Sequence, residues 1–317
     1  MLFKASIRRL YKGEKILKLL VTGAAGMLGS ALCPILREQG HLVIATDIRM
    51  LTEDVRKLDV RDLNGVEDFC RLNKPDAVMH LAAETNLELC EKDIEHAYKT
   101  NAIGTRNMAW VCRDLSIPLL YISTIGVFDG TKLDPYDEND IPNPINVYGR
   151  TKWAGEIIIE SVLRKYFIVR AGWMIGGGER EKKFVALIIQ QIRSGSRRIQ
   201  VVTDKLGTPT YNADFARGLA WFINSHHYGT YNLSSGAIVS RYQVAEQILK
   251  TLGRSDIELI GITSDSQYIK DNFPTLRPLS EAMCSIKTEV LGLHCMRPWD
   301  VALEEYLRTH YKDDIVQ

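Results

Sequence analysis

The sequence predicts an α/β fold with a doubly wound parallel sheet and a smaller C-terminal lobe. Short apolar runs alternate with helix-like segments over roughly the first half of the chain, which is the rhythm of βαβ units. A glycine-rich turn joins the first apolar run to the first helix. After residue 171 the alternation weakens and loops become frequent. Together these observations indicate one large sheet domain and a lobe assembled from separate segments.

The composition narrows the class of protein. Forty basic and 39 acidic residues in 317 give a formal net charge of +1, so no bulk charge favours nucleic acid or an anionic membrane as partner. The six cysteines form no Cys-x-x-Cys pair, which favours reduced thiols and a cytoplasmic location. The seven histidines show no ligand spacing, and no apolar run is long enough to span a membrane. We therefore expect no bound metal and no membrane partner.

The first elements carry a nucleotide-binding pattern. The apolar strand at residues 19–21 leads into Gly23, Gly26 and Gly29, and residues 30–32 open a helix. Gly-x-x-Gly-x-x-Gly between a strand and a helix is the dinucleotide-binding fingerprint of Rossmann-type folds. The glycines allow a tight turn, close approach of a pyrophosphate and close helix packing, and free N–H groups at the helix start face the phosphate.

The second strand supplies an acid. Residues 41–46 are apolar and end in Asp47, at the distance downstream where a carboxylate accepts hydrogen bonds from the adenosine ribose. A carboxylate there favours NAD(H) over NADP(H), because it repels a 2′-phosphate. Arg49 offsets part of that repulsion, so NADP(H) stays open as the cofactor.

The remaining elements follow in alternation. We predict helices at 63–72, 94–113 and from Tyr148 to about 163, and strands at 77–81, 118–123 and 167–170. Further on we predict helices at 184–193 and 214–223, a loop at 203–210, and a strand at 230–233 that rejoins the sheet.

These elements suggest domain boundaries. We assign residues 15–170 to the dinucleotide-binding domain, with 208–235 returning to it. The smaller lobe comprises 171–207 and 236–317. Residues 1–14 form a basic extension, for which a mitochondrial targeting role is the alternative left open.

Three residues have the types and positions expected for proton transfer. Tyr148 and Lys152 are four apart, so a helix places them on one face. A free phenol has a pKa near 10, and we expect the Lys152 ammonium to lower the pKa of Tyr148. Thr124 ends a predicted strand, where its hydroxyl can polarise the same substrate oxygen, although it also fits a purely structural role.

With these motifs the chain resembles the extended short-chain dehydrogenase/reductases, and most closely the dTDP-4-dehydrorhamnose reductase family. The shared stretches run from the fingerprint to near the C-terminus and include residues 101–107, 123–124 with 127–130, 146–152 with 154–156, 207–210 and 277–278. The resemblance implies reduction of the 4-keto group of a nucleotide-linked 4-keto-6-deoxy sugar. It implies that Tyr148 donates the proton, that Thr124 binds the oxygen, and that Lys152 holds the nicotinamide ribose. It also implies that Trp173 lies against the sugar, although a core role for this tryptophan is equally open.

The expected contacts follow from the fingerprint and the resemblance. For the cofactor they are Gly23, Ala25, Gly26, Met27, Leu28, Asp47, Ile48, Asp59, Val60, Leu81, Ala82, Ala83, Asn101, Tyr148 and Lys152. For the substrate they are Thr85, Thr124, Ile125, Trp173 and Lys183. Alternatives remain for three of these residues: Asp59 as a helix cap, Asn101 as a packing residue and Lys183 as a solvated loop charge.

The chain also departs from the family pattern. Ile125 and Gly126 replace the usual Asp-Tyr, Lys183 replaces an asparagine, and Ser280–Glu281 replaces Asn-Ser after Arg277–Pro278. A different sugar or nucleotide is therefore plausible. Two other functions stay open: an epimerase that retains NAD, and a non-catalytic subunit resembling the regulatory subunit of methionine adenosyltransferase. A dehydratase is disfavoured, because Ile125 and Gly126 cannot perform acid–base elimination. A homodimer also stays open.

Overall fold

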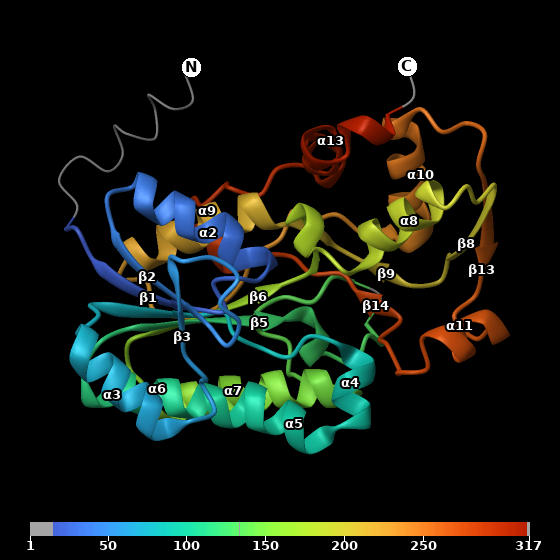
Figure 1. Ribbon diagram of the computed structural model, residues 1–317. Coiled ribbons are helices and arrows are strands. Elements are labelled where there is room, and N and C mark those ends of the chain that lie inside the picture. Colours follow the sequence, from blue (N-terminus) through green and yellow to red (C-terminus); the bar gives the residue numbers. More distant parts are fainter. Residues whose placement is uncertain (1–14, 133, 316–317) are drawn as a thin grey trace.

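A parallel sheet forms the centre of the protein (Figure 1). The computed structural model describes residues 15–132 and 134–315, and the predicted extension 1–14 lies outside these described residues. Within this part of the chain, seven strands lie in the order β11-β6-β5-β4-β1-β2-β3, and every neighbouring pair is parallel. They are β1 (Lys18–Thr22), β2 (Leu42–Asp47), β3 (Val55–Lys57), β4 (Ala77–His80), β5 (Leu119–Thr124), β6 (Tyr166–Ala171) and β11 (Gly229–Asn232). The predicted doubly wound α/β class is confirmed.

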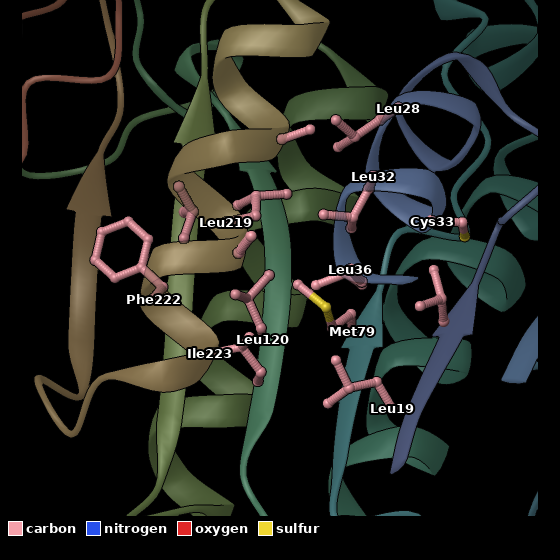
Figure 2. Close-up of a cluster of buried hydrophobic side chains, with 14 of the residues drawn as sticks. Leu19, Leu28, Leu32, Cys33, Leu36, Met79, Leu120, Leu219, Phe222 and Ile223 are labelled. Carbon is pink, nitrogen blue, oxygen red and sulfur yellow. The ribbon is translucent and has the colours of Figure 1, made fainter. Parts of the chain in front are cut away.

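Helices cover both faces of this sheet (Figure 1). One face carries α2 (Met27–Glu38) and α9 (Asn212–Asn224), and the other carries α3 (Leu63–Asn73), α6 (Gly104–Asp114) and α7 (Val147–Val162). Figure 2 shows the core between the sheet and the first pair, where Leu32 and Leu219 face Met79 and Leu120. Burying such side chains stabilises the fold by about 1.5–3 kcal/mol each. The sheet is therefore a rigid base whose carboxyl edge presents the site.

The predicted helix 94–113 contains a change of pitch. It consists of α5 (Ile94–Tyr98), a π-helical turn η1 (Lys99–Ile103) and α6. Short π-helical turns are rare and occur frequently at functional sites. Here the turn contains Asn101, which is fully buried. A hydrophobic periodicity cannot reveal such a turn, because the apolar face continues through it.

The C-terminal lobe is built on short strands. It contains α8 (Phe184–Arg193), α10 (Arg241–Leu252), α11 (Gln267–Asn272) and α13 (Trp299–His310), with the strand pair β8 (Arg198–Val202) and β13 (Glu258–Ile262). A three-stranded sheet joins β12 (Val239–Ser240), β9 (Leu206–Gly207) and β14 (Ser280–Glu281). The prediction of a loop at 203–210 is wrong, because β9 and β10 (Pro209–Tyr211) lie there. Strands of two or three residues are too short to show a periodicity.

Smaller elements complete the described chain. β7 (Trp173–Ile175) pairs with β10, and α4 (Leu87–Lys92) and α12 (Ile286–Val290) are short helices. β11 pairs in parallel with β6, so the chain does return to the large sheet after α9. In the described residues, no helix has the length and apolar character that crossing a membrane requires.

Candidate functional site

The glycine-rich turn lies at the carboxyl end of β1. Gly23 has φ of 69°, and a Cβ there would come within 2.7 Å of the Ala82 nitrogen, so both the turn and the close approach require glycine. Helix α2 begins at Met27, earlier than predicted, and Gly26 at its N-cap leaves the first N–H groups without a side-chain cap. Such an N-terminus suits a phosphate group.

Asp47 holds the glycine-rich turn in place. Its buried carboxylate accepts hydrogen bonds from the Ala25 nitrogen at 3.1 Å and from the Arg49 nitrogen at 3.0 Å. The Arg49 guanidinium lies 3.7 Å away and is largely exposed. The structure therefore brings Asp47 beside the turn, as the fingerprint predicts, and adds a second role in fixing Ala25.

The other residues predicted to contact the cofactor have different surroundings. Leu81 and Ala82 follow β4 beside Gly23, where the Leu81 nitrogen donates to the Thr22 carbonyl at 3.2 Å. Asp59 instead pairs closely with Arg61, which lowers the pKa of its carboxyl by hydrogen bonding. The remaining predicted cofactor residues vary in exposure: Val60 is buried, Ala83 is half-buried and Ile48 is exposed. Thr85, predicted for the substrate, is also exposed.

A buried hydrogen-bonded chain, not predicted from the sequence, runs beneath the site through His80. Thr105 Oγ1 lies 2.6 Å from the Asn101 carbonyl, which only accepts, so Thr105 donates there and accepts from His80 Nε2 at 3.1 Å. His80 Nδ1 then accepts from the Thr22 hydroxyl at 2.7 Å, and Thr22 accepts from the Ala82 nitrogen at 3.3 Å. These contacts assign the neutral Nε2–H tautomer. Burial, with a smaller effect of the Lys152 charge, lowers the pKa of His80 to about 3.

Asn101 continues this chain to helix α7. Its amide nitrogen donates to Thr151 Oγ1 at 2.9 Å and to the Glu84 carbonyl at 3.0 Å, and its amide oxygen accepts from the Glu84 nitrogen at 2.8 Å. Thr151 in turn donates to the Tyr148 carbonyl at 2.8 Å. Asn101 thus ties the π-helical turn to α7, which carries Tyr148.

Thr124 and Tyr148 flank one glycine. The Thr124 hydroxyl accepts from the Gly126 nitrogen at 3.0 Å, which leaves its own proton free to donate. A Cβ on Gly126 would lie 3.3 Å from Thr124 Oγ1 and 3.9 Å from Tyr148 Cδ1. Asn146 caps α7 by accepting from the Gly149 nitrogen at 2.8 Å, which fixes the first turn that carries Tyr148.

The protonation of Tyr148 differs from the prediction. Burial raises the pKa of the phenol above its usual value near 10, and the Thr124 hydroxyl only partly opposes this. The expected lowering by Lys152 is therefore wrong for this structure. The buried Lys152 ammonium lies 4.0 Å from the centroid of the Tyr121 ring instead. Burial lowers the pKa of Lys152 to about 7, against the opposing charge of Glu156.

Trp173 is enclosed on both faces. Its ring lies against Gly207, where a Cβ would come within 2.2 Å, and the Arg241 guanidinium carbon lies 3.6 Å from the ring centroid. Its indole N–H donates to Glu281 Oε2 at 2.7 Å. The residue is 7% exposed, so only an edge of the ring is available to a ligand.

The other residues predicted to contact the substrate have different surroundings. Ile125 is buried in an apolar cluster with Val127, Phe128 and Met283, and so serves packing. Lys183 lies at the N-cap of α8 and is exposed, which suits either a solvated charge or contact with a ligand. It nevertheless faces Arg241 closely enough that desolvation, and then the Arg241 charge, lower the pKa of Lys183.

Sequence reasoning missed several residues of this site. His80 is a lone histidine in an apolar run, and that irregularity was the available signal. Lys205 and Arg241 flank two-residue strands and carry no local signal. Glu281 was noted as a departure from the family pattern, but no contact was predicted for it. No group of three or more potential metal ligands occurs among residues 15–132 and 134–315.

Comparison with known proteins agrees with this geometry. The family model for the RmlD substrate binding domain matches residues 17–312. The spore coat polysaccharide biosynthesis protein SpsK of Bacillus subtilis is 32% identical over 291 residues, which are 92% of this chain and 97% of that protein. A dTDP-4-dehydrorhamnose reductase of Mycolicibacterium smegmatis is 30% identical over 290 residues, 91% of this chain and 84% of that enzyme.

Solved structures give the same result. The dTDP-4-dehydrorhamnose reductase of Bacillus anthracis, crystallised in complex with NADP, superposes with a TM-score of 0.83 at 30% identity. The match covers 92% of this chain and 99% of that one. The similarity therefore extends over both the large sheet and the C-terminal lobe.

Proposed function

Because this chain belongs to the RmlD substrate binding domain family, we propose that it is an NAD(P)H-dependent reductase of a nucleotide-linked 4-keto-6-deoxy sugar. The observation that carries the proposal is that Thr124 and Tyr148 both lie close to Gly126, with Lys152 one turn further along α7. A glycine-rich turn that suits a dinucleotide lies at the same edge of the sheet.

The residues divide the reaction between them. When bound at the glycine-rich turn, a reduced nicotinamide cofactor would supply the hydride that reduces the keto carbon. The Thr124 hydroxyl donates a hydrogen bond to the keto oxygen and orients it, without losing its proton. Tyr148 stays protonated at neutral pH, because burial raises its pKa, and transfers its proton to that oxygen as negative charge develops. Lys152, one turn further along α7, would hold the nicotinamide ribose, and solvent returns the proton to Tyr148.

The choice of cofactor follows from Asp47 and Arg49. Asp47 is buried beside the glycine-rich turn, and its charge disfavours a 2′-phosphate. Arg49 is exposed and lies 3.7 Å from Asp47, where it can offset that charge. We therefore favour NADH with NADPH as the alternative, which the NADP complex of the Bacillus anthracis relative supports for that protein.

The test is turnover by a Tyr148→Phe variant. With reduced cofactor and dTDP-4-keto-6-deoxyglucose, loss of the proton donor should lower kcat by about 10²–10⁴-fold. Tyr228→Phe is the matched control, because Tyr228 precedes β11 at the opposite edge of the sheet. Full turnover by Tyr148→Phe would contradict the assignment. Sugar inversion without net oxidation of NADH would indicate an epimerase, and a stable hetero-complex without turnover would indicate a regulatory subunit.

A further inference from the structure

Three basic side chains of the C-terminal lobe lie near Trp173 or near Glu281, which accepts its indole N–H. They are Lys183, Lys205 and Arg241, here called the basic cluster. The small sheet β12-β9-β14 brings two of them together. β12 runs antiparallel to β9, so Arg241, directly after β12, meets Lys205, directly before β9, and its nitrogen donates to the Lys205 carbonyl at 3.4 Å. Lys183 joins them from the start of α8.

The Arg241 guanidinium is held in place but has no ionic partner. It stacks 3.6 Å from the centroid of Trp173 and 5.1 Å from that of Phe184. Within the described residues it forms no side-chain hydrogen bond and no salt bridge, although a guanidinium offers five N–H donors. A planar donor fork fixed by aromatic rings and left unpaired is suited to bind a carboxylate or phosphate in bidentate geometry.

The two lysines add unneutralised charge. Neither forms a salt bridge in the part of the chain that the structure describes, and Lys205 Nζ donates only to the Arg277 carbonyl at 2.6 Å. Three acids lie near these cations, and each is hydrogen-bonded to other groups: Glu281 accepts the Trp173 indole N–H, Glu181 accepts the Tyr306 hydroxyl, and Asp204 accepts the Ser264 hydroxyl. Desolvation, and then repulsion from Arg241, lower the pKa of Lys183.

The basic cluster adjoins the reacting groups. Thr124 pairs with Ala171 in the large sheet, and Trp173 lies two residues beyond Ala171. The Glu281 charge also acts on Tyr148, where it contributes to the raised pKa of the phenol. A ligand oxygen on Arg241 would thus belong to the same molecule that meets Tyr148.

We propose that Arg241, together with Lys183 and Lys205, binds an oxyanion of the substrate and selects substrates that carry one near the reacting sugar. This inference rests on the proposed function for the identity of the substrate. This oxyanion is either the diphosphate of the nucleotide or an acidic group on the sugar. Either would offset the mutual repulsion of the three cations.

The experiment is calorimetric titration at low ionic strength, because screening weakens such contacts. Inorganic pyrophosphate, dTDP, UDP-glucose and UDP-glucuronate are titrated into the full chain and into Arg241→Gln, Lys183→Asn and a control, Arg308→Gln. Arg308 lies exposed on α13 and pairs with Glu304. Lys183→Asn replaces an exposed residue, so the test holds even where loss of Arg241 loosens the packing of Trp173.

The two sources give different results. If the diphosphate is bound, Kd for pyrophosphate and dTDP rises about tenfold or more in both variants and is unchanged in the control. If an acidic sugar is bound, Kd for pyrophosphate and for dTDP is unchanged in both variants. The unmodified chain then prefers UDP-glucuronate to UDP-glucose, and both variants lose this preference. Equal Kd values for all four proteins, or no binding to the unmodified chain, would overturn the proposal. Turnover of dTDP-4-keto-6-deoxyglucose, measured separately, tests the proposed function independently of this outcome.

Discussion

The polar residues on the two sides of Tyr148 differ in whether they have partners within the protein. On the side of the large sheet, Thr22, His80 and Thr105 form a chain of neutral hydrogen bonds in which each acceptor meets a donor. On the side of the lobe, Arg241 and Lys183 carry charges without ionic partners among the described residues. The first arrangement is complete in the protein alone. The second acquires its partner charge from a ligand.

The two sides therefore suit two different roles: one positions the reacting groups, and the other selects the substrate. A satisfied buried network holds its members in one geometry, which suits groups that orient a cofactor and a proton donor. Unpaired cations that lie close together repel one another and do not stabilise the fold, and an anion that binds between them relieves this repulsion, which suits a site that discriminates substrates. The same contrast makes predictions about stability on one side and about binding on the other.

The largest effect on stability is expected from a buried charge pair on the side of the large sheet. Glu156 on α7 and Arg170 on β6 are both buried and hydrogen-bonded at 2.7 and 3.0 Å. Glu156→Gln leaves the Arg170 cation buried without a counter-charge, so the free energy of unfolding should fall by about 3–5 kcal/mol. Urea unfolding at neutral pH measures the loss.

A double variant sharpens that result. Replacing both partners, as in Glu156→Met with Arg170→Met, removes the buried charges together and should be less destabilising than Glu156→Gln alone. A double variant as unstable as the single one would mean that the packing of these side chains, rather than the charge balance, governs this region.

Most candidate residues on the side of the large sheet can be picked out from the sequence, whereas most of those on the side of the lobe cannot. The fingerprint glycines, Asp47, Tyr148 and Lys152 lie within short stretches whose spacing reflects one turn or one strand end, so local pattern suffices. Arg241 and Glu281 meet Trp173 only through two-residue strands far apart in the chain, which leave no periodicity. The pKa of Tyr148 was also mispredicted, because burial depends on the whole fold rather than on the position of Lys152.

An intermediate effect is expected on acidification, through His80. Its folded pKa of about 3 lies below the value of 6.5 for an unperturbed histidine, so between these values the unfolded chain binds more protons. The contribution of His80 to stability is complete above pH 6.5 and is lost as the pH falls toward 3. Between pH 7 and 4.5 this amounts to roughly 2–3 kcal/mol.

Urea unfolding at both pH values, with His80→Asn beside the unmodified chain, isolates this contribution. The variant should be less stable at pH 7 but lose less stability on acidification. His294→Asn serves as control, because His294 is exposed and should leave the pH dependence unchanged. An unaltered slope in His80→Asn would show that the neutral hydrogen-bonded chain is not the acid-sensitive part of the fold.

The smallest effect is expected on the side of the lobe, from Glu281→Gln. Glutamine retains an oxygen that accepts the Trp173 indole N–H, so the ring should keep its place. The change removes the acid that partly neutralises the basic cluster, and Kd for pyrophosphate should therefore fall roughly two- to fivefold, the size expected for charges that still meet solvent. Glu246→Gln, exposed on α10, is the control.

The same substitution also tests whether the two sides are coupled through Tyr148. Because the Glu281 charge contributes to the raised pKa of the phenol, Glu281→Gln should move the alkaline limb of the kcat profile to lower pH while kcat at neutral pH stays nearly constant. Tighter anion binding without this movement would mean that the lobe selects the substrate but does not adjust the proton donor. Weaker anion binding would instead mean that Glu281 acts mainly by holding Trp173 beneath Arg241, and that the position of the guanidinium matters more than the net charge around it.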